Sequence, residues 1–77
     1  MVHGFILLQL VPGLEKEALE QIRLTEGITE VTLVFGRWDA VIAVEAKTIN
    51  RMTNTIIKQL RGIQGVAQTE TLVATEY

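Results

Sequence analysis

An internal repeat of 35 residues limits the possible folds of this chain more than any other feature of its sequence. The two copies run from an apolar extended stretch, at 3–11 and again at 38–46, through a helical pattern to Gly-Ile-x-x-Val and a second extended stretch. A shift of 35 positions superimposes similar residues: Leu14 on Ile49, Ile22 on Ile57, Gly27 on Gly62, Ile28 on Ile63 and Val31 on Val66. Each copy is therefore predicted to be a β-α-β unit, and the whole chain to be βαββαβ.

Each helical pattern has a single apolar stripe. The first helix should begin near Pro12-Gly13, because proline favours a helical start, and its stripe consists of Leu14, Ala18, Leu19 and Ile22. The second should begin after Thr48 as N-cap, and its stripe consists of Ile49, Met52, Ile56, Ile57 and Leu60. We expect Gly27 and Gly62 to cap the two helices in the left-handed conformation. Each helix then buries one face against a sheet.

The predicted strands are apolar on both faces. Alternate residues of a strand point to opposite sides, yet both sets are largely apolar in residues 5–10 and 41–44. Two right-handed crossovers place both helices on one side of the sheet, so another layer must cover the other side. We therefore predict an α+β, ferredoxin-like fold with a four-stranded antiparallel sheet that dimerises through its open face, as in a dimeric α/β barrel.

The size of the chain supports a single domain and an oligomer. A boundary within 77 residues would leave two pieces too small to fold, so residues 1–77 are predicted to form one domain. The core of such a small domain contributes roughly 3–5 kcal/mol, and the sequence has no cysteine for a disulfide. Hydrophobic residues make up 48% of the chain, which suits a surface covered by another subunit. We expect a homodimer that assembles further.

Composition also excludes several classes of function. The net charge is -2 with scattered basic residues, so we expect no direct nucleic-acid binding. No apolar run reaches the ~20 residues of a membrane span, and no basic segment precedes the first apolar stretch, so we expect a cytoplasmic protein. With no Cys, a single His at His3 and no phosphate-binding glycine loop, we expect no catalytic residues, metal or cofactor, and hence no enzyme.

One compact group of residues stands out, the sequence Gly36-Arg37-Trp38-Asp39 between the second and third extended stretches. It suits a tight hairpin turn in which glycine takes unusual backbone angles and the polar side chains bond the turn. It also suits a binding site in which Asp39 accepts hydrogen bonds from an ammonium group, Gly36 lets a ligand approach and Trp38 forms an apolar wall. The residues alone leave both interpretations open.

The order of several short motifs resembles a known family. The motifs are Pro12-Gly13 before a helix, Gly27-Ile28-x-x-Val31, Gly36-x-x-Asp39, Gly65-Val66 and Thr69-x-Thr71-Leu72-Val73. Together they resemble the C-terminal effector domain of the leucine-responsive and asparagine-regulator (Lrp/AsnC) transcription factors, over nearly the whole chain. The resemblance implies a ferredoxin-like domain that dimerises through its sheets, assembles dimers into rings that are often octamers, and binds amino-acid effectors between dimers.

The resemblance also implies an effector site. Gly36 and Asp39 match the family turn that meets the effector, and Asp39 is expected to bind its amino group. Trp38 stands where the family often has another aromatic residue, and Arg37 either balances the effector carboxylate or projects into solvent. Thr69 and Thr71 match polar positions near the same pocket, although solvated strand residues explain them equally well. On this basis Asp39→Ala should abolish the effector response without unfolding the protein.

We expect no counterpart of the family's helix-turn-helix domain, because the first extended stretch starts at residue 2 or 3. We therefore expect a stand-alone module that senses an amino acid, buffers it, or co-assembles with full-length Lrp/AsnC regulators and so modulates transcription of amino-acid metabolism. Three alternatives stay open: a dimeric α/β-barrel monooxygenase-like enzyme, the regulatory amino-acid-binding domain attached to metabolic enzymes, and a purely structural oligomeric scaffold.

Overall fold

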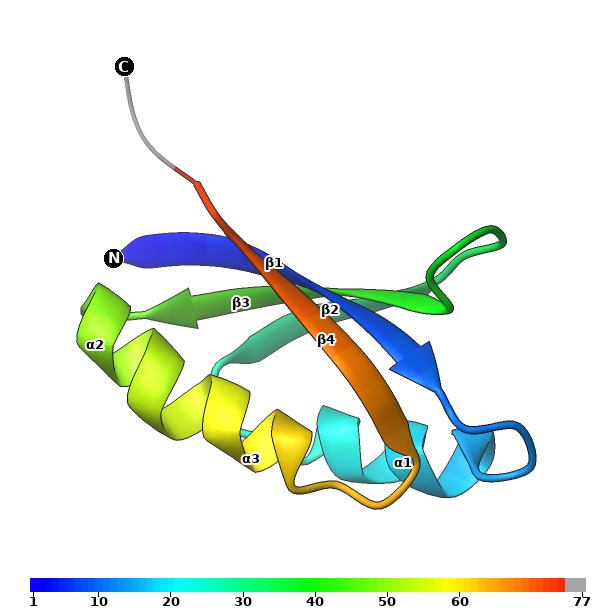
Figure 1. Cartoon of the computed structure of the whole chain (residues 1–77). Coiled ribbons are helices and arrows are strands. Elements are labelled where there is room, and N and C mark those ends of the chain that lie inside the picture. Colours follow the sequence, from blue (N-terminus) through cyan, green and yellow to red (C-terminus); the bar gives the residue numbers. More distant parts are fainter. Residues whose placement is uncertain (75–77) are drawn as a thin grey trace.

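The computed structural model describes residues 1–74 and has two layers, one sheet and one layer of helices (Figure 1). The elements in chain order are β1 (Val2–Leu10), α1 (Glu15–Arg23), β2 (Ile28–Leu33), β3 (Ala40–Ala46), α2 (Ile49–Arg51), η1 (Met52–Ile57), α3 (Lys58–Arg61) and β4 (Val66–Val73). The sheet is antiparallel with the order β2-β3-β1-β4, and both helical segments lie on one side of it. The predicted ferredoxin-like βαββαβ fold is confirmed.

The core lies between the sheet and the helices. Strands β1 and β3 alternate, so that residues such as Ile6 and Ile42 face the helices and are fully buried. The helical layer contributes the buried residues Ala18, Ile22, Met52, Ile56, Ile57 and Leu60. These residues belong to the two predicted stripes. The prediction for Ile49 is wrong, because its side chain is exposed in the first turn of α2.

The opposite face of the sheet is not covered by any helix of residues 1–74. Its apolar residues, here called the outer face, are Phe5, Leu7, Val41, Ala43 and Leu72. Phe5 is 46% exposed and Leu72 is 49% exposed. These exposures explain why both sides of β1 and β3 are apolar in sequence, since one side packs on helices and the other is the side predicted to meet a second copy.

The helix ends agree in part with the predictions. The Thr48 hydroxyl accepts a hydrogen bond from the Arg51 backbone N–H at 3.0 Å, which confirms the predicted N-cap. α2, η1 and α3 follow one another directly, and the π-helical turns of η1 were not predicted. Gly27 has the expected positive φ of 94°, but the C-cap of α1 is Leu24. Gly62 is the C-cap of α3 but has φ −82°, and Gly65 takes the positive value of 103° instead. Within residues 1–74, no helix is long and apolar enough to cross a membrane.

Candidate functional site

The connection between β2 and β3, residues 34–39 and here called the hairpin, projects from one end of the sheet (Figure 1). Its base is closed by a hydrogen bond from the Val34 N–H to the Asp39 carbonyl at 3.0 Å. Gly36 at its tip has φ +127°, a conformation that other residues rarely adopt, and a Cβ there would meet no atom within 4 Å. The turn therefore needs glycine for its backbone angles and not for lack of space.

Asp39 holds the hairpin to β1 through its backbone and its side chain. Its N–H donates to the Leu8 carbonyl at 2.8 Å, and its Oδ2 accepts from the Leu10 N–H at 2.8 Å. The carboxylate thus accepts the hydrogen bond of the Leu10 N–H that a backbone carbonyl of a neighbouring strand would otherwise accept. This contact lies next to the point where the β1–β4 register shifts. Oδ1 makes no hydrogen bond to residues 1–74 and remains available to a ligand.

A pocket of about 350 Å³ opens between the hairpin and the start of α1. This hairpin pocket has apolar walls and two carboxylates, and it is lined by Leu10, Pro12, Leu19, Leu33, Val34, Phe35, Glu15 and Asp39. Glu15 is fixed there because its Oε1 accepts a hydrogen bond from the Gly13 N–H at 2.6 Å. An apolar cavity with an acidic edge suits a ligand that combines an ammonium group with an apolar body.

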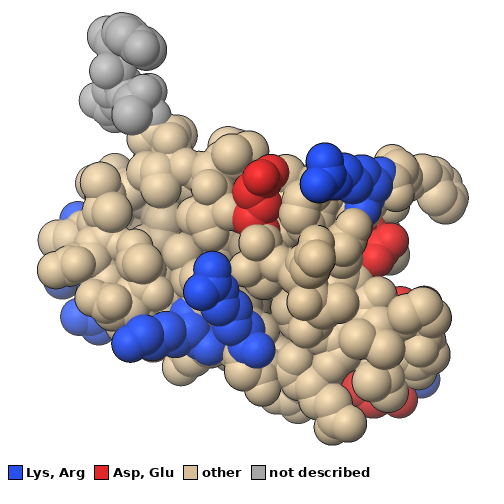
Figure 2. Space-filling view, in the orientation of Figure 1, with Lys and Arg blue, Asp and Glu red and all other residues tan. Residues whose placement is uncertain are grey.

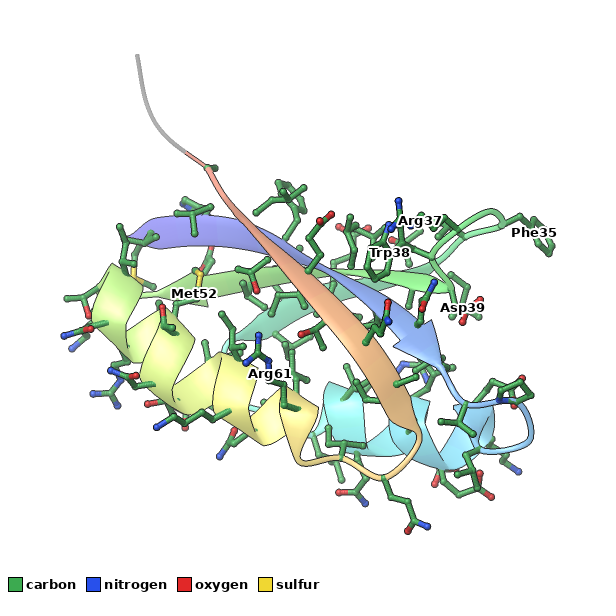
Figure 3. All side chains as sticks on the ribbon, in the orientation of Figure 1. Phe35, Arg37, Trp38, Asp39, Met52 and Arg61 are labelled. Carbon is green, nitrogen blue, oxygen red and sulfur yellow. The ribbon has the colours of Figure 1, made fainter. Side chains whose placement is uncertain are left out.

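Arg37 and Trp38 lie beside the hairpin pocket without lining it. The Arg37 guanidinium stands over the Trp38 ring, 5.7 Å from its centroid, and both side chains extend from the hairpin in Figure 3. The Gln9 side-chain amide donates to the Arg37 carbonyl at 2.7 Å, which ties this part of the turn to β1. Within one chain, Trp38 therefore packs on the Arg37 cation, and its expected role as an apolar wall for a ligand stays a prediction.

Thr69 and Thr71 lie on β4, opposite Leu8 and Ile6 of β1. Because paired residues share a face, both threonines point to the side covered by helices. The Thr69 hydroxyl accepts a hydrogen bond from Arg61 Nε at 3.3 Å. Neither threonine lines the hairpin pocket. Of the residues predicted for the effector site, the structure therefore brings together, within one chain, only those of the hairpin.

Sequence reasoning missed most of the pocket walls. Leu10, Pro12 and Leu19 come from the end of β1, from the turn after it and from α1, where they look like ordinary strand, turn and helix residues. Phe35 offered a usable signal, because a large apolar residue directly before a turn glycine has no strand to pack on. Glu15 offered another, since it follows the turn at Pro12-Gly13 that brings α1 toward the hairpin.

Other hollows in the described part of the chain carry less chemistry. One of about 880 Å³ lies between α1 and α3 and is lined mainly by long polar side chains such as Glu20, Lys58 and Gln59. None of the described residues forms a group of three or more His, Cys, Asp or Glu that could hold a metal ion. The hairpin pocket is smaller, yet it combines apolar walls with fixed carboxylates, and for that reason it is the candidate site.

Residues 4–77 match the family model described as the Lrp/AsnC ligand binding domain. The chain belongs to the Lrp/AsnC family. An uncharacterised HTH-type transcriptional regulator of Pyrococcus furiosus is 40% identical to it over 74 residues, which are 92% of this chain and 49% of the regulator. This Lrp/AsnC chain thus spans about half the length of the curated relatives that it matches. The resemblance seen in the short motifs is confirmed, and the family is one of transcription regulators.

Solved structures share the fold of this chain. A protein of Thermus thermophilus has a TM-score of 0.90 and 26% identity, covering 100% of this chain and 96% of that one. A transcriptional regulator of Neisseria meningitidis, solved as a complex with L-Met, has a TM-score of 0.82 and 15% identity, covering 97% of this chain and 50% of the regulator. At that identity the likeness shows the shared fold alone.

Proposed function

We propose that this Lrp/AsnC domain binds an amino acid with an apolar side chain in the hairpin pocket, and that binding alters its assembly and so the activity of a transcription regulator in the cytoplasm. The observation that carries this proposal is the hairpin pocket itself, about 350 Å³ with apolar walls and two fixed carboxylates. The proposed module has no catalytic role, consistent with a family of regulators.

The charges of the pocket determine how an amino acid would lie in it. Its ammonium group would donate to Asp39 Oδ1, with Glu15 adding further negative charge, while its side chain would contact Leu10 and Leu19. The same carboxylates repel the ligand carboxylate, which therefore needs a cation from outside the pocket. Figure 2 shows that Lys and Arg gather over the segment from α2 to α3. In the hairpin the basic residue is Arg37, and it is therefore the cation that suits the ligand carboxylate.

Assembly is the proposed output of ligand binding. The outer face presents a patch of apolar side chains, beside Glu70 on β4, on which a second copy can pack, and this supports a homodimer as the basic unit. Further association of dimers, with an octamer as the expected form, places hairpins of neighbouring dimers close to one another. A ligand bound there would shift the oligomeric state of this chain or of full-length Lrp/AsnC partners.

The arrangement gives no support to the monooxygenase alternative. Such an enzyme needs polar side chains inside a cavity between sheet and helices. Within residues 1–74 that layer is filled by aliphatic side chains, and no polar or charged residue is buried. We therefore retain the regulatory interpretation.

Ligand titration of the wild-type chain and Asp39→Asn tests the proposal. Asparagine keeps an oxygen that accepts from the Leu10 N–H but lacks the charge for an ammonium group, so the fold should persist while effector affinity falls about 10- to 100-fold. We would first screen the twenty amino acids by thermal shift and then measure affinity by calorimetry. Glu20→Gln is the matched control, because Glu20 is an exposed carboxylate outside the hairpin pocket.

Equal effector affinity in Asp39→Asn and wild type would refute the site. Stabilisation by no amino acid at any concentration up to about 10 mM would refute the class of ligand, because a useful effector gives a concentration-dependent rise in the unfolding midpoint. Loss of affinity in both Asp39→Asn and Glu20→Gln would point to a general effect of net charge instead of a contact at the pocket.

A further inference from the structure

Phe35 is a large apolar side chain that packs against none of residues 1–74. It extends from the end of the hairpin and is fully exposed (Figure 3). Leu33, two residues earlier, is 59% exposed and lines the hairpin pocket together with Phe35. A single exposed phenylalanine is unremarkable on a protein surface, but this one stands at the edge of an apolar pocket that its own ring does not fill.

We propose that Phe35 of a second copy of this chain occupies the hairpin pocket in the absence of ligand, with the exchange made in both directions, and that the effector displaces it. The inference rests on the proposed function in one respect, since it takes the hairpin pocket to be the ligand site. It adds a named contact between copies and a direction for the effect of ligand on assembly.

The dimensions of the hairpin pocket suit an aromatic ring. An apolar cavity of about 150 Å³ is known to hold benzene in a protein interior. The hairpin pocket measures about 350 Å³, which leaves room for one benzyl group against Leu10, Pro12 and Leu19. The apolar side chain of a bound amino acid would contact the same three walls, so the two occupants compete for them.

The position of Phe35 favours a second copy as its host. The side chain and the pocket belong to one surface patch, because Phe35 itself borders the pocket. A two-fold axis beside such a patch places the Phe35 of each chain over the pocket of the other. A patch that carries both the projecting side chain and the cavity is complementary to itself, whereas an unrelated partner would have to supply both parts separately.

Charge points to the same arrangement. The hairpin pocket carries Glu15 and Asp39, and Arg37 follows Phe35 by two residues on the projecting turn. Arg37 is exposed and forms no ion pair with a carboxylate of residues 1–74; its contact is with the ring of Trp38. Docking Phe35 into a neighbouring chain brings the Arg37 cation toward the acidic edge of that chain's pocket, which favours association and fixes its orientation.

This contact is separate from the outer face. A chain with two self-complementary surfaces, one on the sheet and one at the hairpin, assembles beyond a dimer because each surface engages a different neighbour. Ligand that displaces Phe35 opens the hairpin contacts and leaves the sheet dimer intact. Because ligand and Phe35 compete for one pocket, removing Phe35 must raise the ligand affinity by the same factor by which Phe35 lowers it.

The test is light-scattering mass of the full chain as wild type, Phe35→Ser and Leu24→Ser, with and without the amino acid found by the screen. Phe35→Ser should reduce the mass to that of a dimer, and it should fold normally because the Phe35 side chain is fully exposed. Leu24→Ser is the control, since Leu24 is 79% exposed at the end of α1 and outside the hairpin pocket; it should keep the wild-type mass.

The inference would be overturned if Phe35→Ser kept the mass of the wild type, or if the wild type itself had the mass of a dimer. Ligand should lower the mass of wild type, and its affinity should rise about fivefold or more in Phe35→Ser at protein concentrations where wild type is assembled. Unchanged mass at saturating ligand would overturn the competition. If no amino acid binds any variant, the proposed function fails while the mass of Phe35→Ser still decides whether Phe35 joins the copies.

Discussion

The helix-covered side of the sheet and the hairpin contain similar apolar residues but hold them in different ways. On the covered side, Ile6, Ile42 and Leu60 are fully buried between the sheet and the helices. At the hairpin, Phe35 is fully exposed, and the segment is held to β1 chiefly by hydrogen bonds from Gln9 and to Asp39. Apolar side chains on the covered side stabilise the fold, whereas those of the hairpin are available to a ligand or a second chain.

The largest expected difference between the two regions is in the effect of removing one apolar side chain. Leu60→Ala should lower the free energy of unfolding by about 2–5 kcal/mol, because it leaves a cavity in a fully packed layer. Phe35→Ala should change the stability of a single chain by less than about 0.5 kcal/mol. Urea denaturation at low protein concentration, where assembly contributes least, measures both. A loss of several kcal/mol in Phe35→Ala would show that the ring packs within its own chain.

The glycines with positive φ give a second, smaller contrast. A Cβ at Gly27 would lie 2.5 Å from Ile56 Cδ1 and 3.1 Å from the Glu45 carbonyl, whereas a Cβ at Gly36 would meet nothing within 4 Å. Gly27→Ala should therefore cost about 2–4 kcal/mol, from backbone conformation and crowding together. Gly36→Ala should cost about 1–2 kcal/mol from conformation alone. Thermal and urea unfolding check the order; equal costs would mean that Ile56 moves aside freely.

The covered side was predictable because its residues obey local periodicity. The repeat of 35 residues predicts β-α-β units, and the stripes that contain Ile22 and Leu60 predict that each unit buries one helical face. Both patterns depend only on spacing along the chain. Two features that depend on how the second helix packs on the sheet were not predictable from spacing. Ile49 fits the stripe but lies beyond the edge of the packed layer, and the left-handed glycine after the second helix is Gly65 instead of Gly62.

The hairpin pocket was predictable only at Gly36 and Asp39, where turn chemistry gives a local signal. Its walls come from β1, α1 and β2, and no pattern in the sequence joins Leu10, Leu19 and Leu33 before the fold is known. The face on which Thr69 lies depends on the β1–β4 register, which a shift between Gln9 and Leu10 interrupts. Sites assembled from distant segments need the tertiary structure that places them.

The smallest expected effect concerns the two roles of Asp39. The sequence alone suggested that Asp39→Ala would leave the fold untouched, but Oδ2 is the acceptor for the partly buried Leu10 N–H. Removing it leaves that donor without a partner and should cost about 1 kcal/mol, or about 4–8 °C in the midpoint for a domain of this size. Asp39→Asn should keep the midpoint within about 2 °C of wild type, because the amide oxygen accepts the same hydrogen bond.

Comparing these two variants separates support of the hairpin from ligand recognition. Thermal unfolding without ligand, at matched protein concentration, should distinguish Asp39→Ala from Asp39→Asn, whereas ligand titration should show both to be weak binders. Two equally destabilised variants would indicate that the negative charge itself holds the hairpin to β1, and the loss of binding in Asp39→Asn would then follow from a displaced turn. Equal midpoints with unequal affinities would instead place the ligand contact on an oxygen that asparagine retains, and not on the charge.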